Sequence, residues 1–382
     1  MTHDDTAPSV SADDRGWRRW ASTALIGAFG LGLLAVWLIP GNTAEAQNRA
    51  RLPWPALTAG AAVDTATYRQ FDAALRDRMG AQAAASEALG DLSVHVLGRS
   101  PSSAVLIGSD HEPFYGEDFA RPCRETEKTL AVVKAQLETD RAAMAAASKY
   151  VLFIVAPNKS TIRRAAVDDV SPDLLRCSDF VRSHVEAWEA EGGLPLITLR
   201  KAVAAVDQKT SAAYLRNDTH RSSTGALTLS DALMQRLVAD QQVPASILTD
   251  LAHPVFSEPA SFVGDLNHMM GVEDVDTATT ASFPRPDVVT TGEYTVGVEG
   301  TPQLHYTSTS TTSALVPGRT LLIGDSFLMN QIPTQLSNFF EDVTVTDLEE
   351  YAQAGEFDRV IVERVERYGA TEEWPPLAST LK

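Results

Sequence analysis

The strongest chemical signal in the sequence is a serine at the end of an apolar run. Residues 321–323 are Leu-Leu-Ile, and Gly324, Asp325 and Ser326 follow them. The apolar run predicts a buried strand, and the residues after it predict a helix that begins at once. Ligands of open α/β sheets bind at such strand ends. A serine there is exposed and close to the free N–H groups of the helix N-terminus, so Ser326 is a candidate nucleophile.

A serine nucleophile needs a base, and His220 is the best candidate among the eight histidines. It ends the segment Asn-Asp-Thr-His, residues 217–220, so Asp218 precedes it by two positions. Residues two apart in an extended segment point to the same side. We therefore expect Asp218 to hold one imidazole nitrogen while the other nitrogen faces Ser326. This is the arrangement of a Ser-His-Asp triad, in which histidine takes the serine proton and the carboxylate stabilises the imidazolium.

Other polar residues are expected at the same edge of the sheet. Gly324 and the backbone N–H of Ser326 are candidates for stabilising the oxyanion of an acyl-transfer reaction. Asn158 and Lys159 follow a predicted strand and are substrate-binding candidates, although Lys159 fits a structural salt bridge equally well. Arg364 either neutralises a substrate carboxylate or braces the last strand. No cysteines and histidines have the spacing of metal ligands, so we expect no metal.

An alternation of strands and helices has to position these residues. Predicted helices cover residues 63–89, 125–148, 172–189, 223–237 and 328–339. Predicted strands cover residues 104–107, 150–155, 194–199, 321–323, 343–346 and 359–362. This alternation predicts βαβ units and a three-layer α/β/α domain with a mainly parallel sheet. Residues 271–313, rich in Thr, Val, Asp and Gly, break the pattern and form a β excursion, a loop near the site or, as we favour, a surface insertion.

The N-terminal part of the sequence predicts export. Residues 21–39 carry no charge, and at about 1.5 Å per residue they nearly match a hydrocarbon core of about 30 Å. Arg15, Arg18 and Arg19 precede this segment and predict a cytoplasmic N-terminus. The chain thus divides into a cytoplasmic tail (1–20), one transmembrane anchor (21–39), a linker (40–62), a globular domain (63–370) and a C-terminal tail (371–382). Cleavage as a signal peptide near Ala-Glu-Ala, residues 44–46, is the alternative and exports the domain as well.

Composition excludes some classes of partner. The chain has 382 residues and a net charge of −18, which disfavours nucleic acid and anionic membrane surfaces because both attract Lys and Arg. An apolar fraction of 44% predicts a sizeable core. The two cysteines, Cys123 and Cys177, both lie in the exported part. They form either a disulfide or two free thiols, since the sequence alone does not fix the distance between them.

Seven segments of the chain match the motifs of one family in the family's order. They are residues 71–78, 105–116, 156–160, 218–226, 264–269, 324–327 and 363–367. Together they resemble the alginate O-acetyltransferase family of the AlgJ/AlgX type, within the SGNH hydrolase-like superfamily, over roughly residues 65–370. The resemblance implies an SGNH-hydrolase-like fold in which Ser326 is the nucleophile, His220 the base and acid, and Asp218 its partner. The chain departs from the family at residues 111–113, His-Glu-Pro instead of Gly-Trp-Leu, and at Arg221, where the family has Trp.

The resemblance also implies a function. Ser326 would take an acetyl group from a donor and pass it to a sugar hydroxyl of a cell-envelope glycan, an exopolysaccharide or a glycolipid. The implied partner is a membrane acyltransferase of the MBOAT class, which delivers the acetyl group. The reaction is expected to need no bound cofactor. With the anchor at residues 21–39, this protein would span the cell membrane once and hold its catalytic domain on the extracytoplasmic side. Arg221 offers a forked charged donor where Trp offers a stacking face, which predicts an altered acceptor pocket. A carbohydrate acetylesterase and a non-catalytic glycan-binding protein remain as alternatives.

Overall fold

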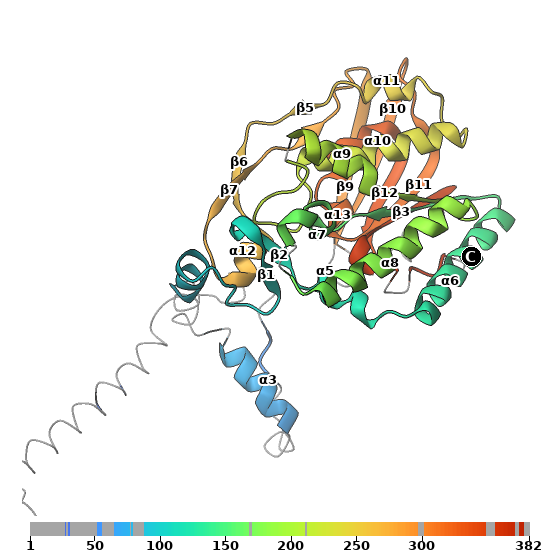
Figure 1. Ribbon diagram of the computed structural model, residues 1–382. Coiled ribbons are helices and arrows are strands. Elements are labelled where there is room, and N and C mark those ends of the chain that lie inside the picture. The colour runs from blue at the N-terminus through green and yellow to red at the C-terminus, as the bar shows by residue number, and fades with distance from the viewer. Residues whose placement is uncertain are drawn as a thin grey trace, which may run out of the picture. The chain divides into compact units, whose positions relative to one another are not determined.

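Figure 1 shows the computed structural model of the chain. The structure describes residues 52–55, 65–76, 78, 88–167, 170–210, 212–296, 302–348, 356–370 and 374–377, and the single positions Gly27 and Gly30. The predicted cytoplasmic tail and anchor lie outside the described residues except for these two glycines, and the predicted linker does so except for residues 52–55. Within the described part, no helix combines the length and the apolar character needed to cross a membrane.

The chain divides into two compact units, and the smaller one comprises residues 1–97 with 270–272. The described part of this unit contains the helix α3 (Thr65–Arg76). Phe71 of this helix contacts Trp54, with ring centroids 5.3 Å apart, and the Arg78 guanidinium lies 4.3 Å from the centroid of the same tryptophan ring. A short π-helix, η2 (Leu92–Val96), follows later in the chain. The helix predicted over residues 63–89 is interrupted at Arg78, which lies in a turn, and the predicted stretch 79–87 lies outside the described residues.

The larger unit, residues 98–269 with 273–382, is built around a seven-stranded sheet in the order β4-β3-β13-β11-β12-β10-β9. Its strands are β3 (Tyr150–Ala156), β4 (Leu196–Thr198), β9 (Val288–Val296), β10 (Pro302–Ser310), β11 (Val316–Gly324), β12 (Phe340–Asp347) and β13 (Arg359–Val365). The pairings from β4 to β12 are parallel, and those of β12 with β10 and of β10 with β9 are antiparallel. The sheet is thus mixed, and the prediction of a mainly parallel sheet was wrong.

The antiparallel part of the sheet comes from the segment that broke the strand–helix alternation. Within residues 271–313, β9 and β10 form a hairpin in which Val288 pairs with Ser310 and Tyr294 pairs with Leu304. The many Thr and Val residues of these strands favour a pleated sheet, because β-branched side chains pack well on it. The favoured surface insertion is therefore a β excursion that extends the central sheet.

Helices cover both faces of this sheet and produce the predicted three layers (Figure 1). One face packs against α6 (Glu127–Ala146) and α8 (Pro172–Glu191), and the other packs against α9 (Arg200–Thr210), α10 (Ser223–Ala239) and α14 (Ile332–Leu336). Side chains alternate along β3, so Phe153 belongs to the first core and Ile154 to the second. Trp374 packs edge-on against Phe153 with ring centroids 5.3 Å apart, so this part of the predicted tail 371–382 belongs to the core.

The helix predicted over residues 328–339 is broken into three short pieces. They are α13 (Ser326–Met329), α14 and the 3-10 turn η6 (Ser337–Phe339). Pro333 lies in the first turn of α14. A proline ring clashes with the carbonyl four residues earlier and has no N–H to donate, so a continuous helix cannot pass through this position.

The remaining described elements are short. The two-stranded ribbons are β1 (Val105–Ile107) with β2 (Pro113–Tyr115), β5 (Val255–Phe256) with β8 (Ala281–Ser282), and β6 (Ala260–Val263) with β7 (Val275–Ala278). The short helices and turns are η3 (Ser109–His111), α5 (Glu117–Ala120), η4 (Pro122–Arg124), α7 (Lys159–Ile162), η5 (Arg164–Val167), α11 (Ile247–Asp250), α12 (Asp265–Met270) and α15 (Glu366–Gly369). The segment predicted as the first strand of the central sheet thus pairs with β2 instead.

The two cysteines form a disulfide. Cys123 in η4 is bonded to Cys177 in α8, and their Cα atoms are 4.8 Å apart. Of the two alternatives that the sequence left open, the structure therefore contains the bridge. It closes a loop between residues 54 positions apart and holds η4 against α8.

Candidate active site

Ser326 lies at the turn from β11 to α13, as the sequence predicted. Its side chain is exposed, while Asp325 before it caps the helix: Phe327 N–H donates to Asp325 Oδ1 at 2.9 Å. The other oxygen of Asp325 accepts the Val365 N–H at 2.8 Å, which ties the turn to the end of the neighbouring strand β13. Both carboxylate oxygens of Asp325 are thus occupied in bracing the turn that presents Ser326.

Gly324 allows this tight turn because it has no side chain. A Cβ atom built at this position would lie 2.5 Å from the Leu328 Cβ atom of α13, much closer than real Cβ atoms approach. The first turn of α13 can therefore pack directly over the end of β11. This packing is a sufficient reason for a glycine here, and it leaves the backbone N–H of Ser326 at the start of the helix.

The structure brings His220 to Ser326 and Asp218 to His220. His220 Nε2 lies 2.8 Å from Ser326 Oγ, and His220 Nδ1 lies 2.6 Å from Asp218 Oδ1. With the proton of the ring on Nδ1, where the carboxylate accepts it, Nε2 is free to accept the serine proton. The imidazole also packs on the Phe327 ring, with centroids 5.2 Å apart. The three predicted residues thus form a continuous hydrogen-bonded relay.

The local backbone that produces this relay is a turn, not the extended segment that we expected. Asp218 Oδ1 accepts the backbone N–H of His220 at 2.8 Å, the side-chain-to-backbone bond typical of an Asx turn. The same oxygen can therefore accept the ring N–H. Ser222 then caps α10 by accepting the Gly225 N–H at 3.1 Å, so the turn leads straight into a helix.

Asp218 is held in its ionised form. Burial alone would raise the pKa of this carboxyl, but the hydrogen bond from the His220 ring and the charge of that ring outweigh burial and lower the pKa below its usual value. Asp218 Oδ2 adds a further bond by accepting the Asp265 N–H at 3.1 Å. An ionised carboxylate at this place can stabilise an imidazolium.

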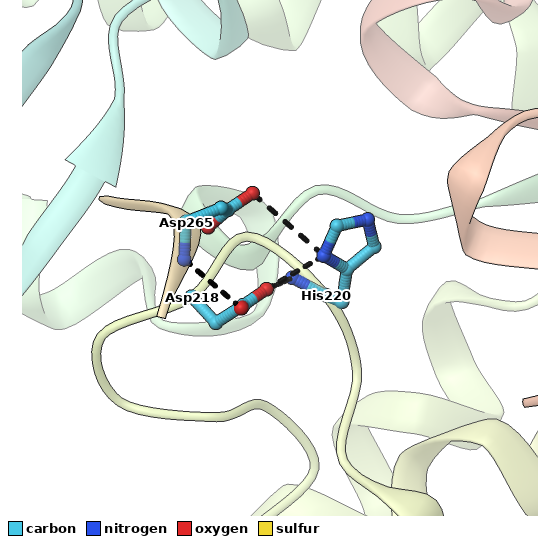
Figure 2. A group of neighbouring side chains, drawn as sticks. All are labelled: Asp218, His220 and Asp265. Carbon is cyan, nitrogen blue, oxygen red and sulfur yellow. Dashed lines mark hydrogen bonds and ion pairs between the residues drawn. The ribbon is translucent and has the colours of Figure 1, made fainter. Parts of the chain in front are cut away.

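A second carboxylate, Asp265, lies beside the same histidine (Figure 2). Its Oδ2 atom is 3.7 Å from His220 Nδ1. Burial and the charge of Asp218 raise the pKa of Asp265, and the charge of His220 opposes this. We did not predict Asp265 as a site residue, although the Gly-Asp-Leu segment 264–266 was one of the matching motifs. Three possible metal-binding atoms, one each from Asp218, His220 and Asp265, lie within 4.8 Å of one another. A cation bound there would have to displace the proton that His220 Nδ1 shares with Asp218 Oδ1.

Lys159 lies in the interior and not at an open substrate site. Its side chain is 2% exposed, and its ammonium donates to the carbonyl oxygens of Pro113, at 2.9 Å, and of Arg216. The ammonium also lies 3.5 Å from Glu112 Oε1. Burial lowers the pKa of Lys159 to about 8, although the charge of Glu112 opposes the shift. These contacts fit a structural salt bridge for Lys159 and not a substrate-binding role. They also support the chain at Arg216, two residues before Asp218.

Asn158 and Arg364 are also buried. Asn158 donates its backbone N–H to Glu366 Oε2 at 3.0 Å, and its side-chain oxygen accepts the Arg367 N–H at 3.3 Å. Arg364 is 4% exposed, and its guanidinium carbon lies 5.8 Å from the centroid of the Tyr368 ring. Both residues therefore brace the junction of β3, β13 and α15, and their contacts fit the bracing alternative for Arg364.

Arg221, expected in an acceptor pocket, lies beneath the nucleophile turn. It is 2% exposed, and its Nη2 atom donates to the carbonyl oxygen of Phe327 at 3.2 Å. The same atom lies 3.4 Å from Glu363 Oε1 of β13. Burial, followed by the charge of Asp325, raises the pKa of Glu363 well above its usual value, while Arg221 opposes the shift. Sequence reasoning missed Glu363 as part of the site, because its partner is distant in the chain.

Comparisons with known proteins agree with this fold. The family model that matches the chain describes the SGNH hydrolase-like domain of the acetyltransferase AlgX, and the match covers residues 105–363. A search of curated proteins finds no match. Among solved structures, the O-acetyltransferase domain of Pseudomonas putida AlgJ is similar, with a TM-score of 0.50, 15% identity, and coverage of 73% of this chain and 98% of that one. Bacillus cereus PatB1 is similar with a TM-score of 0.51, 11% identity, and coverage of 70% of this chain and 98% of that one. The chain therefore belongs to the AlgX family of SGNH hydrolase-like acetyltransferase domains.

Proposed function

We propose that this protein is an extracytoplasmic O-acetyltransferase that works through an acetyl ester on Ser326. The observation that carries the proposal is the relay from Ser326 Oγ to His220 Nε2, at 2.8 Å, and from His220 Nδ1 to Asp218 Oδ1, at 2.6 Å. An exposed serine hydroxyl in such a relay is equipped for acyl transfer. Membership of the AlgX family supports acetyl as the transferred group.

The first half-reaction transfers the acetyl group to the enzyme. His220 Nε2 removes the proton from Ser326 Oγ while that oxygen attacks the acetyl carbonyl carbon of the donor ester. The carbonyl oxygen becomes negative, and the backbone N–H of Ser326 is the donor that we propose for stabilising it. As the bond to the leaving oxygen breaks, His220 gives the proton to that oxygen. The products are an acetyl ester of Ser326 and the deacylated donor alcohol.

The second half-reaction transfers the acetyl group to the acceptor. A sugar hydroxyl gives its proton to His220 Nε2 and attacks the acetyl carbon. Ser326 Oγ then leaves and takes the proton back, which restores the starting state. Asp218 accepts the Nδ1–H of His220 throughout and stabilises each imidazolium. Lowering of the Asp218 pKa by His220 supports this role, because the carboxyl stays ionised.

We propose that the enzyme acts outside the cell membrane, with residues 21–39 as its single anchor. The bond between Cys123 and Cys177 supports an oxidising compartment, because disulfides are rare in the reducing cytosol. The acceptor that we propose is a cell-envelope glycan, an exopolysaccharide or a glycolipid. The proposed source of acetyl groups is an MBOAT-type membrane acyltransferase, and the reaction needs no metal or bound cofactor.

The full chain, purified in detergent, tests the proposal with a chromogenic acetyl ester and a panel of neutral oligosaccharides. We expect faster release of the chromophore with an acceptor present, and acetylated oligosaccharide in the mass spectrum. Ser326→Ala should abolish both, and transfer by this variant would contradict the proposal. Release of the chromophore without transfer to any acceptor would instead identify an acetylesterase.

A serine-directed sulfonyl fluoride addresses the non-catalytic alternative. Bacillus cereus PatB1 has been solved with a sulfonyl adduct, which makes this class of reagent a suitable probe. We expect stoichiometric labelling of Ser326 and no labelling of that position in Ser326→Ala. Unlabelled wild-type protein would favour a glycan-binding protein without activity.

A further inference from the structure

The turn that carries His220 is held by a carboxylate outside the Ser-His-Asp relay. Thr219, between Asp218 and His220, donates its backbone N–H to Asp265 Oδ1 at 2.7 Å. The hydroxyl of Thr219 donates to Asp265 Oδ2 at 2.5 Å. One carboxylate thus accepts both polar hydrogens of the residue that joins Asp218 to His220.

These bonds restrict how the turn can move. Thr219 is 5% exposed, so its hydroxyl and N–H would lose hydrogen bonds without gaining water if the turn rotated. The backbone of Asp265 contributes as well, because its N–H donates to Asp218 Oδ2 at 3.1 Å (Figure 2). Asp218 and Asp265 therefore restrict each other's position, and both hydrogen-bond to the segment 218–220 that carries His220.

Asp265 also adds a negative charge where the reaction needs one. Its Oδ2 atom lies 3.7 Å from His220 Nδ1 and approaches this nitrogen from a different direction than Asp218 does (Figure 2). The charged groups that act on this turn include Asp218, Asp265 and, from β7, Asp276, which accepts the Asn217 N–H. From α7, the Lys159 ammonium interacts with both Asp218 and Asp265. Two carboxylates side by side repel each other, so this arrangement is costly unless a positive imidazolium forms between them.

We propose that Asp265 is a positioning residue of the acyl-transfer reaction. It fixes the turn at Thr219 so that His220 Nε2 faces Ser326 Oγ, and it stabilises the imidazolium that forms when His220 takes the serine proton. The inference rests on the proposed function, since it assigns Asp265 a part in the same reaction. It extends the Ser-His-Asp relay to a fourth residue that comes from another element, α12.

Asp265→Asn is the primary variant, because it keeps the shape of the side chain and removes the charge. Asp276→Asn is its matched control: Asp276 accepts the Asn217 N–H at 3.2 Å and so also supports this loop, from β7, with no bond to His220 or Thr219. Thr219→Val removes the hydroxyl's bond to Asp265 Oδ2 and its 3.4 Å contact with His220 Nδ1, and Thr219→Ser restores both. The full chain is used throughout, with thermal melting to establish that each variant is folded.

We expect Asp265→Asn to lower kcat/KM for the acetyl ester by roughly 10- to 100-fold, mainly through kcat, because misplacing a catalytic group by about 1 Å has such an effect. The acid limb of the kcat/KM profile should move to lower pH by about one unit, since an anion beside the imidazolium is lost. A merely structural role would not move that limb. Thr219→Val should lose part of the rate, Thr219→Ser should recover it, and Asp276→Asn should match the wild type.

An Asp265→Asn protein with the wild-type rate and an unmoved acid limb would overturn the inference. An equal loss of rate in Asp276→Asn would also overturn the inference, because the rate would then depend on any carboxylate that supports this loop and not on Asp265 in particular. In both cases acetylation of Ser326 in the wild type would still support the proposed function. If Asp265→Asn does not fold, a Thr219→Val rate equal to that of the wild type overturns the inference.

Discussion

Replacing Gly264 by alanine should damage catalysis without touching any residue of the relay. A Cβ atom at Gly264 would lie 1.9 Å from the carbonyl oxygen of Asn217 and 3.1 Å from the backbone N of Asp218. Real Cβ atoms essentially never come closer than 3.0 Å, so one of the two backbones must move by about 1 Å. Either the turn that carries Asp218 and His220 shifts, or the start of α12 with Asp265 does.

The expected size of the effect follows from this displacement. A catalytic group misplaced by about 1 Å costs roughly 100-fold in rate, and overpacking of this kind costs about 1–3 kcal/mol of unfolding free energy. Gly264→Ala should therefore fold, melt a few degrees lower and lose most of its kcat with a chromogenic acetyl ester.

Gly193→Ala is the matched control for this prediction. Gly193 follows α8, and a Cβ atom built there would meet nothing within 4 Å. This variant should keep both the rate and the melting temperature of the wild type. A Gly264→Ala enzyme with full kcat would refute the reasoning, because it would mean that the contact between the two backbones does not position the relay. Equal losses in both variants would refute it as well.

Three further predictions concern stability. Replacing Cys123 and Cys177 by serine should lower the unfolding free energy by about 4 kcal/mol, from the loop entropy of a 54-residue separation, and unchanged denaturant unfolding would contradict this. Arg221→Met should cost about 3 kcal/mol, because it removes the guanidinium that lies 3.4 Å from the fully buried Glu363 carboxyl. Adding Glu363→Met should recover most of the loss, and additive losses in chemical denaturation would count against a buried pair. Because the pKa of Lys159 is lowered to about 8 from 10.5, the folded chain binds this proton more weakly than the unfolded chain does. The contribution of Lys159 to the unfolding free energy should therefore rise by about 3 kcal/mol from pH 8 to pH 10.5. If the unfolding free energies of the wild type and of Lys159→Met change in parallel over this pH range, this prediction is wrong.

Local sequence patterns were sufficient for the elements that carry the nucleophile. The apolar run before Gly324 predicted β11, and the residues after it predicted a helix over residues 328–339, whose first piece, α13, begins at Ser326. The pairing of Asp218 with His220 was also predictable, because the two residues are neighbours in the chain. The reason that we gave was wrong, however, since an Asx turn and not an extended strand brings the side chains together.

Features that depend on distant segments could not be predicted in this way. The hairpin of β9 and β10 joins the sheet by pairing β10 with β12, and nothing in the composition of residues 271–313 specifies that partner. Asp265 reaches Thr219 across 46 positions of the chain. Arg221 resembled a surface donor because a buried cation is rare, and its burial becomes understandable from two distant partners, the Phe327 carbonyl oxygen and Glu363 on β13.

The most direct test of the account is the mass of the protein during turnover. The full chain is incubated with an activated acetyl ester in the absence of acceptor, quenched in acid and digested. The account predicts a gain of one acetyl group on the peptide that contains Ser326, its disappearance when an acceptor sugar is added, and no gain in Ser326→Ala or His220→Ala. An active enzyme that never carries acetyl on Ser326, or that carries it equally in His220→Ala, would contradict the central claim.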